Sequence, residues 1–373
     1  MSIELRPYQI KPVEALANTR LGYIEARAGS GKTIMVAMAC KFHEVKALKP
    51  LHVVWLAGTK EIVEQGKQAC DAVGLLGTQE FHCFQGLKEV PECDILVVDE
   101  CHQVAAPSYK DLLRTTLYKE DGRWKRRCIT LGMTATKDRD DGEPIEPIIG
   151  PCVYRVDPDE IKKAGGVLPC EVRVVEYGQD RTKEIEQEAS KLYDGRLQWA
   201  DRNKGTDENW KRCLYRSACQ IGILNDPQRD KLIAELVTKH DGETVLVLVG
   251  QVEHGKRIAS MIPNAVVFHS GMKQRAEKIK LLKAGVIKVA IATQLADQGL
   301  DVPIASVLIM AHGGRSWRAT IQRTGRILRP HAGKTKGIVY DFKDVSHPML
   351  TAQFWTRVRH YKKIGYGIDT LWS

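Results

Sequence analysis

The chain has 373 residues, a length that is too great for one ordinary domain and suits two α/β domains. Its hydrophobic content of 43% and charged content of 27% are those of a soluble globular protein, and no apolar run is long enough to span a bilayer. The net charge of +10 favours a polyanionic partner without identifying one, because some soluble proteins are basic for no specific reason.

The 10 cysteines include no pair at CxxC spacing and none followed by histidine at zinc-finger spacing. Several, such as Cys40 and Cys128, lie in apolar runs where a reduced, buried thiol is the ordinary interpretation. The N-terminal residues, MSIELRPYQ, contain no apolar stretch of signal-peptide length. We therefore expect a soluble, cytoplasmic protein that does not contact a membrane.

Short apolar runs of strand length alternate along the chain with amphipathic stretches, a pattern typical of parallel sheets flanked by helices. The predicted strands of the first half are 21–26, 52–56, 95–98 and 128–132. Those of the second half are 244–249, 265–269, 288–292, 306–310 and 336–340. Continuous Val, Ile and Leu runs indicate strands buried on both faces. The fold class predicted is therefore α/β, with two doubly wound parallel sheets in succession.

The composition changes between the two series of strands. Residues 142–169 are rich in Gly and Pro and are expected to form loops and a linker. Residues 181–225 are highly charged, contain Trp199 and Trp210, and are expected to form a helical insertion. The predicted division is a first domain at 1–158, a linker and helical insertion at 159–230, and a second domain at 231–373.

The strongest local motif is Ala26-Arg27-Ala28-Gly29-Ser30-Gly31-Lys32-Thr33, between a predicted strand and a helix-like run. This is the context of a phosphate-binding loop, in which glycines let backbone N–H groups surround a β-phosphate. Lys32 would reach the β- and γ-oxygens of ATP, and Thr33 would supply a hydroxyl to Mg²⁺. The alternative is a Gly-rich turn that happens to precede a helix.

A second motif, Ile95-Leu96-Val97-Val98-Asp99-Glu100-Cys101-His102, is an apolar strand that ends in two carboxylates. Such residues lie at the carboxyl edge of a doubly wound sheet, where ligands bind. Asp99 would hold Mg²⁺ through water, and Glu100 would orient or deprotonate the attacking water. A simple strand-end turn is the alternative, but the position after a phosphate-binding loop favours a Walker B motif.

A third motif, Gln322-Arg323-Thr324-Gly325-Arg326-Ile327-Leu328-Arg329, places Arg326 and Arg329 on one face of a helical turn. Two guanidinium groups from a second domain would neutralise charge on a transferring γ-phosphate. The alternative is a solvated basic helix.

Taken in order, these segments resemble the motifs of superfamily 2 helicases, and the resemblance extends from residue 6 to about residue 330. Arg6-Pro7-Tyr8-Gln9 resembles the N-terminal motif in which a glutamine reads adenine. The loop at 26–33 resembles motif I, and Asp99-Glu100-Cys101-His102 resembles motif II in its DExH form. Thr134-Ala135-Thr136 resembles motif III.

The remaining motifs follow in the expected order. Ala57-Gly58-Thr59-Lys60 resembles motif Ia, and His269-Ser270-Gly271-Met272 resembles motif IVa. Residues 292–303 resemble motif V, and 322–329 resemble motif VI. Three departures stand at Gly58, Lys137 and Gln298, where Pro, Pro and an acid are usual. They concern strand contact and coupling rather than ATP hydrolysis.

The resemblance implies two tandem RecA-like P-loop domains that hydrolyse ATP between them with Mg²⁺. The implied catalytic residues are Lys32, Asp99, Glu100, Gln322, Arg326 and Arg329. The implied nucleotide-binding residues are Arg6, Gln9, Ala28, Gly29, Ser30, Gly31, Lys32, Thr33, Gly299 and Asp301, with Thr33 and Asp99 at the metal. The implied nucleic-acid contacts are Gly58, Thr59, Lys60, His269, Ser270, Thr293 and Gln294. The implied coupling residues are His102, Thr134 and Thr136; the alternative for His102 is the capping of a strand-end loop.

The spellings DECH, TAT and QRTGRILR resemble DNA-directed members, namely the XPB-like, type III restriction-like and phage branch-migration helicases. This implies an ATP-dependent DNA helicase or translocase, a monomer in a bacterial or phage-infected cell, that moves over any sequence of duplex or branched DNA. The alternatives are an RNA-directed ATPase, a nucleotide-gated protein that clamps or anneals strands, and the motor subunit of a larger machine. The basic-aromatic segment 357–363 is expected either to pack on the second domain or to reach the substrate.

Overall fold

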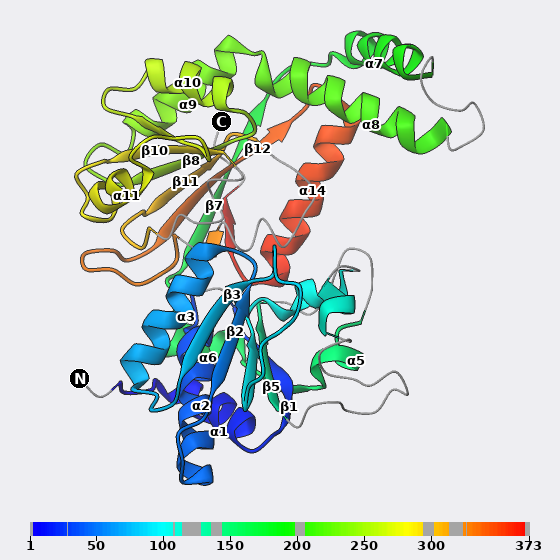
Figure 1. The fold of residues 1–373 in the computed structure, drawn as a ribbon. Helices are drawn as coiled ribbons and strands as arrows, with labels where there is room; N and C mark the ends of the chain where they lie inside the picture. The colour runs from blue at the N-terminus through cyan, green and yellow to red at the C-terminus, as the bar shows by residue number, and fades with distance from the viewer. Residues whose placement is uncertain are drawn as a thin grey trace. The chain divides into compact units, whose positions relative to one another are not determined.

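The computed structural model describes residues 3–27, 29–106, 109–113, 128–135, 144–197, 206–293, 302–312, 324–325 and 327–369. The chain forms two compact units, Met1–Val167 and Leu168–Ser373. Each unit contains one parallel sheet flanked by helices (Figure 1), so the two tandem α/β domains predicted from the sequence are confirmed. None of the described helices is long and apolar enough to cross a membrane.

The first unit contains a six-stranded sheet of order β3-β2-β4-β5-β1-β6, in which all the strand pairs are parallel. Its strands are β1 (Leu21–Glu25), β2 (Val53–Ala57), β3 (Gln79–Cys83), β4 (Ile95–Val98), β5 (Ile129–Thr134) and β6 (Cys152–Arg155). Its helices are α1 (Pro7–Ala17), α2 (Lys32–Ala47), α3 (Lys60–Val73), the 3-10 helix η1 (Cys101–Ala105), α5 (Glu146–Ile149) and α6 (Pro158–Lys163).

The second unit contains a seven-stranded parallel sheet of order β13-β7-β12-β11-β8-β10-β9. Its strands are β7 (Cys170–Tyr177), β8 (Val245–Val249), β9 (Val266–Phe268), β10 (Val289–Thr293), β11 (Val307–Met310), β12 (Gly337–Asp344) and β13 (Gly367–Asp369). Its helices are α7 (Thr182–Leu197), α8 (Thr206–Cys219), the π-helix η2 (Gln220–Leu224), α9 (Pro227–Thr238), α10 (Val252–Ser260), α11 (Arg275–Lys283) and α14 (Pro348–Lys363).

The structure differs from the predicted linker and insertion at 159–230, because this segment supplies strand β7 of the second sheet. β7 pairs with β12 along eight residues, from Cys170↔Gly337 to Tyr177↔Asp344. Its sequence, CEVRVVEY, mixes polar and apolar residues and is only partly buried, so it lacks the continuous apolar run of the predicted strands. The boundary between the two compact units accordingly follows Val167, whereas the predicted first domain ends at residue 158. Helices α7 and α8 occupy the part expected to be helical.

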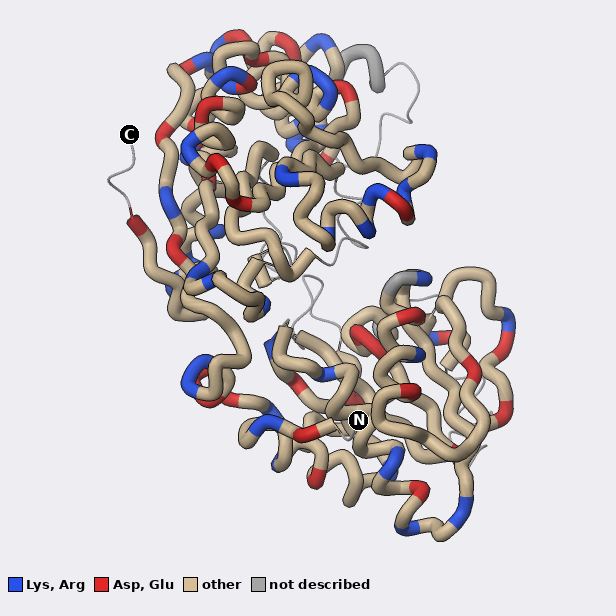
Figure 2. The backbone as a smooth tube through the Cα atoms, turned by 90° about the vertical axis from the view of Figure 1, so that its left-hand side faces the viewer, with Lys and Arg blue, Asp and Glu red and all other residues tan. Residues whose placement is uncertain are grey.

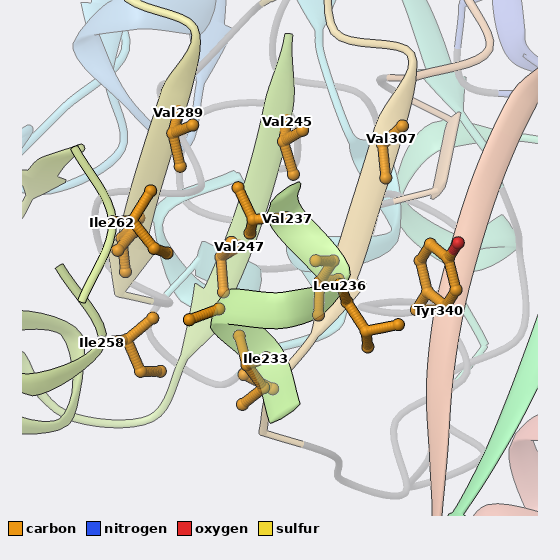
Figure 3. Close-up of a cluster of buried hydrophobic side chains, with 14 of the residues drawn as sticks. Ile233, Leu236, Val237, Val245, Val247, Ile258, Ile262, Val289, Val307 and Tyr340 are labelled. Atoms are coloured by element: carbon orange, nitrogen blue, oxygen red, sulfur yellow. The ribbon is translucent and has the colours of Figure 1, made fainter. Parts of the chain in front are cut away.

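The core of the second unit forms where α9 and α10 cover the apolar strands (Figure 3). Ile233 and Val237 of α9 lie in one buried cluster with Val245 and Val247 of β8. Helix α9 starts where it does because the carboxylate of Asp226 accepts hydrogen bonds from the backbone of the first turn. Packing of this kind fixes β8, and β8 in turn separates β11 from β10.

Helix α14 is attached to the sheet by a buried ion pair. The Arg357 guanidinium donates to both carboxylate oxygens of Asp341, with Nε–Oδ2 at 2.9 Å and Nη2–Oδ1 at 2.8 Å. The Tyr361 hydroxyl donates to the same carboxylate at 2.8 Å. Burial alone would lower the pKa of Arg357, but Asp341 outweighs it and raises that pKa. Part of the segment 357–363 is therefore a packed component of the second unit.

Replacing Arg357 by alanine should leave Asp341 as a buried carboxylate without its main partner. We expect Arg357→Ala to lower the free energy of unfolding of the second unit by about 3–5 kcal/mol, measured by urea denaturation. Arg359→Ala is the matched control, since Arg359 lies two residues along the same helix and is exposed; its effect should stay within about 0.5 kcal/mol. Equal losses in the two variants would contradict the assignment.

Candidate functional site

The candidate nucleotide-binding residues of the first unit gather at one edge of its sheet. β1, β4 and β5 lie side by side, with Glu25 paired to Thr134 and Val98 paired to Gly132. The three strands therefore end together, and the segments that follow them meet. These segments are the loop before α2, the Asp99-Glu100 pair and the start of the motif that begins at Thr134. This edge is where ligands of doubly wound sheets bind.

The loop before α2 has the backbone geometry of an anion site. Gly29 and Gly31 have φ angles of 85° and 81°, which glycine adopts without strain. Helix α2 begins directly after Gly31, so its first N–H groups have no partner within the helix. The Ser30 hydroxyl is buried without a hydrogen-bond partner among the described residues, and Lys32 is also buried. A buried ammonium and unused donors beside a helix N-terminus suit a phosphate.

The start of α1 supports this loop from outside. The Tyr8 hydroxyl and the Gln9 amide nitrogen both donate to the Ser30 carbonyl oxygen, at 3.0 and 2.9 Å. The Arg6 backbone N–H donates to the Gln9 amide oxygen at 2.9 Å, which orients the amide. Gln9 still has one amide hydrogen and one lone pair for a ligand. Tyr8 was not among the predicted site residues, although it lies inside the motif that contains Gln9.

The residues after β4 form a polar chain that leads to the end of β5. The Glu100 backbone N–H donates to the Asp99 carboxylate at 2.8 Å. One nitrogen of His102, Nδ1, lies 3.3 Å from the Glu100 carboxylate and 3.0 Å from the Thr134 hydroxyl. All four side chains are buried or nearly so. His102 thus connects the second carboxylate to the strand that begins the predicted motif III.

The two carboxylates differ in their affinity for protons. Burial, and then the charge of Glu100, raise the pKa of Asp99 to about 7. Burial alone would raise the pKa of Glu100 too, but the hydrogen bond from His102 and the charge of Lys32 outweigh it and lower that pKa. Glu100 is therefore the group that stays ionised and able to accept a proton. A cation beside Asp99 would favour its ionised form.

These residues fit ATP and Mg²⁺. The chemistry of the donor set matches, since Thr33 supplies a hydroxyl and Asp99 a carboxylate, both oxygen ligands of the type that Mg²⁺ prefers. The unpartnered Ser30 hydroxyl and the buried Lys32 match a triphosphate. Within the described part of the chain, no group of three or more His, Cys, Asp or Glu side chains could hold a metal by itself. The metal would therefore depend on the nucleotide and on water for most of its ligands.

The segment after β2 contains the predicted motif Ia. The Thr59 hydroxyl accepts a hydrogen bond from Ile62 N at 3.4 Å and caps α3. A Cβ added at Gly58 would lie 2.8 Å from the amide oxygen of Gln103, so only glycine fits there without a shift. The contact shows that the Gln103 side chain packs against the backbone of the predicted motif Ia. It also places Gln103, which the sequence did not single out, between motif II and motif Ia.

In the second unit, the predicted motifs IVa and V follow neighbouring strands. His269 and Ser270 come after β9, and Thr293 ends β10, which pairs with β9 in register. Ser270 is exposed, whereas Thr293 is buried. Thr293 and Gln294 are both predicted nucleic-acid contacts, and of these two residues the structure describes Thr293.

Lys334 connects the predicted motifs V and VI. Its ammonium donates to the carbonyl oxygens of Pro303, Ala305 and Arg329, at 2.9, 2.6 and 3.2 Å. Burial, and then the charge of Arg329, lower the pKa of Lys334 to about 8. This clamp fixes the backbone of Arg329, the predicted arginine of motif VI. The sequence analysis missed Lys334, because its partners are up to 31 residues away in the chain.

Several predicted site residues lie outside the described residues, so the structure places none of them: Ala28, Thr136, Gln294, Gly299, Asp301, Gln322 and Arg326. The described residues of motif VI are 324–325 and 327–329, and the Leu328 carbonyl oxygen accepts a hydrogen bond from the Leu168 backbone N–H at 2.8 Å. The Thr324 hydroxyl lies 3.2 Å from the Tyr366 hydroxyl.

Two family models match the chain. The model of the type III restriction enzyme, res subunit, matches residues 2–89, and the model of the helicase conserved C-terminal domain matches residues 228–331. The first match contains the predicted motifs I and Ia. The second ends shortly after motif VI.

Similar proteins come from a virus and from archaea. A protein of Sulfolobus islandicus filamentous virus that bears a helicase name is 25% identical, over 91% of this chain and 64% of its own length. The DNA 3'-5' translocase XPB2 of Sulfurisphaera tokodaii is also 25% identical, over 88% of this chain and 79% of its own length. The chain thus spans less than two thirds of the viral relative.

Solved structures share the fold. A DNA-bound ATP-dependent Type ISP restriction-modification enzyme, LlaBIII, matches 98% of this chain and 30% of its own length, with a TM-score of 0.63 and 14% identity. The Hef helicase domain of Pyrococcus furiosus matches 94% of this chain and 98% of its own, with a TM-score of 0.53 and 15% identity.

Alanine at Gly31 should damage the phosphate loop. Its Cβ would lie 2.5 Å from the Gln9 amide nitrogen at a φ angle that disfavours side chains. We expect Gly31→Ala to weaken ATP binding at least tenfold, about 1.4 kcal/mol, in a fluorescence titration. Gly74→Ala is the control, since Gly74 also has positive φ but no neighbour within 4 Å of its Cβ. Equal weakening by both variants would contradict the role of the Gln9 contact.

Methionine at Lys334 should release the carbonyl oxygens that the ammonium holds. We expect Lys334→Met to lower the free energy of unfolding by about 2–3 kcal/mol and to reduce kcat for ATP hydrolysis, because the Arg329 backbone loses its clamp. Lys336→Met is the control, since Lys336 forms a half-exposed pair with Glu171 and should cost less than about 1 kcal/mol. A Lys334→Met protein with normal stability and kcat would refute the clamp.

Proposed function

We propose that the chain is a superfamily 2 helicase of the XPB-like and type III restriction-like group, which hydrolyses ATP to move along or unwind DNA. The observation that carries the proposal is the edge of the first sheet. There a phosphate loop with a buried lysine and an unpartnered serine hydroxyl adjoins the Asp99-Glu100-His102-Thr134 chain. This set contains the parts that phosphoryl transfer to water requires.

In the proposed mechanism, the first unit binds and activates the reactants. The N–H groups of the loop and the Lys32 ammonium hold the β- and γ-phosphates, and Gln9 with Arg6 binds the base. Mg²⁺, when bound through Thr33 and Asp99, neutralises phosphate charge. Glu100 would orient the attacking water and accept its proton, and its lowered pKa keeps the carboxylate ionised for this role.

Arginines of the second unit complete the proposed site. Arg326 and Arg329 would neutralise the charge that develops on the γ-phosphate, with Gln322, Gly299 and Asp301 beside the nucleotide. The clamp by Lys334 supports this proposal, since an arginine that must meet a phosphate needs a fixed backbone. Because the required groups come from both units, hydrolysis would depend on their approach.

The chain Glu100–His102–Thr134 is the proposed route of coupling. Glu100 would orient the attacking water, and His102 Nδ1 lies 3.3 Å from the Glu100 carboxylate and 3.0 Å from the Thr134 hydroxyl at the end of β5. When the γ-phosphate leaves, a change in the Glu100 interactions would reach Thr134 and Thr136 directly. The proximity of Gln103 to Gly58 offers a second connection, from motif II to motif Ia.

The proposed nucleic acid is DNA, bound without regard to sequence. Gly58, Thr59 and Lys60 of the first unit and His269, Ser270, Thr293 and Gln294 of the second would hold phosphates. DNA is favoured because the archaeal relative is named a DNA translocase and the restriction enzyme with the same fold is bound to DNA. RNA is the second candidate, since an rRNA helicase of Candida albicans is 24% identical over 85% of this chain.

Steady-state ATP hydrolysis tests the proposal. We expect weak activity alone, strong stimulation by single-stranded or branched DNA, and little stimulation by duplex RNA. Lys32→Ala and Glu100→Gln should each lower kcat at least a hundredfold, because they remove phosphate binding and water activation. Glu100→Gln should still bind ATP, since the loop is intact.

The controls separate the alternatives. Arg326→Ala should abolish hydrolysis with ATP binding retained, which a one-domain kinase of small molecules would not show. Stimulation by RNA alone would replace DNA by RNA as the substrate. Full stimulation by DNA without strand separation on forks would leave a translocase. No stimulation by any nucleic acid, with Arg326→Ala fully active, would refute a nucleic-acid motor.

A further inference from the structure

Helix α14 presents a basic-aromatic face that the proposed mechanism does not use. Trp355, Arg359 and Lys362 stand at positions i, i+4 and i+7 and are exposed, so they form one stripe along the helix. Trp355 is 49% exposed although it is a large aromatic side chain. At 1.5 Å per residue, the stripe from Trp355 to Lys362 is about 10 Å long.

A third cation comes from the neighbouring strand. The Lys343 ammonium of β12 lies 5.9 Å from the centre of the Trp355 ring, and Phe354 packs against the edge of the same ring at 5.3 Å between centroids. Lys343 also forms an ion pair with Glu176 at 2.7 Å. Contacts with Lys343 and Phe354 thus hold the Trp355 ring in place, while the rest of the ring faces solvent.

Helix α14 differs in charge from α7, α8, α9 and α10 of the same unit, each of which contains acidic residues. Figure 2 shows Lys and Arg positions beside Asp and Glu positions along much of the chain. In each of these four helices one lysine or arginine pairs with a glutamate three or four residues away: Lys191–Glu188, Arg212–Glu208, Lys231–Glu235 and Lys256–Glu253. The sequence of α14, PMLTAQFWTRVRHYKK, contains no acidic residue at all. Its outer face therefore keeps a net positive charge.

The inner face of α14 is well packed, so the exposure of Trp355 does not reflect a loosely attached helix. Arg357 and Tyr361 are fully paired with Asp341, and Phe354 and Val358 are buried against β7. The helix is therefore rigidly seated, and its outer residues are presented in a fixed arrangement. A fixed aromatic ring between cations is the surface that binds an unpaired base and the phosphates next to it.

We propose that the Trp355-Arg359-Lys362 face of α14, with Lys343, binds a second DNA segment, the displaced single strand of a fork. The inference rests on the proposed function, since it concerns the same substrate. This face lies apart from the residues after β9 that would hold the first strand, because β12 and β9 are four strand spacings, about 19 Å, apart in the sheet. Two arms of a fork would occupy the two places.

Binding measurements on matched DNA substrates test the proposal by fluorescence anisotropy over a series of salt concentrations. The substrates are a fork with two single-stranded arms and the two partial duplexes that each retain one arm. We expect Trp355→Ala to weaken binding of the fork about tenfold. Arg359→Ala combined with Lys362→Ala should lower the slope of log K against log salt by about 1.4 to 1.8. These variants should bind one of the two partial duplexes, the one that lacks the displaced arm, as tightly as the wild type does.

The matched control removes two exposed lysines elsewhere in the second unit. Lys231→Ala combined with Lys256→Ala makes the same change in net charge and should leave fork binding and its salt slope as in the wild type. Trp355→Phe should retain most of the affinity, because an aromatic face remains. All variants should keep the ATPase rate measured without DNA, since no altered residue belongs to the proposed nucleotide site.

The outcomes are distinguishable. If the wild-type chain binds the fork with DNA-stimulated hydrolysis while the α14 variants bind it equally well, the inference is overturned and the proposed function stands. If the α14 and control variants lose affinity alike, the effect is one of net charge and the inference is overturned too. If the wild-type chain binds none of the DNA substrates, the proposed function and the inference fail together.

Discussion

The common ending of β1, β4 and β5 at one sheet edge is the constraint on which the nucleotide site depends. The proposed phosphate loop follows β1, and the Asp99 and Glu100 carboxylates follow β4. Thr134, which contacts His102, ends β5. The parallel register fixes their spacing before any side chain is chosen, because Glu25 pairs with Thr134 and Val98 with Gly132. A shift of one residue in one strand would turn its side chains to the other face and separate these parts.

Backbone conformation and side-chain support act together in the loop. Gly29 and Gly31 allow a turn that exposes N–H groups, but the Ser30 carbonyl between them needs donors because it points away from solvent. Tyr8 and Gln9 supply these donors from α1. The start of the chain is therefore tied to the proposed phosphate loop as well as to the proposed site of the base. This explains why a motif 20 residues before the loop belongs to the same site.

The sequence predicted the strands with continuous apolar runs, including the edge strand β9, and missed β3, β6, β7 and β13, which lie at or near the sheet edges. β3 and β6 are edge strands, and neither has a fully buried residue. β7 alternates polar and apolar residues next to a Gly- and Pro-rich segment, so its pattern resembled a linker. In the site, motif order identified residues such as Lys32 and Glu100. It did not reveal Tyr8, Gln103 or Lys334, because their roles arise from contacts with backbone and side chains far away in the chain.

Helix α14 shows how one short element serves two purposes. Residues two apart on a helix point about 200° apart, so Arg357 turns to the sheet and Arg359 to solvent although both are arginines. The buried arginine is held by Asp341, whose desolvation is compensated only by this pairing and by Tyr361. Arg359 is exposed and does not compensate a buried charge, and α14 contains no acidic residue that could pair with its guanidinium. Helix α14 can therefore stabilise the second sheet through Arg357 and Tyr361 while Arg359 and Lys362 remain exposed, which supports the proposal that its outer face binds a polyanion.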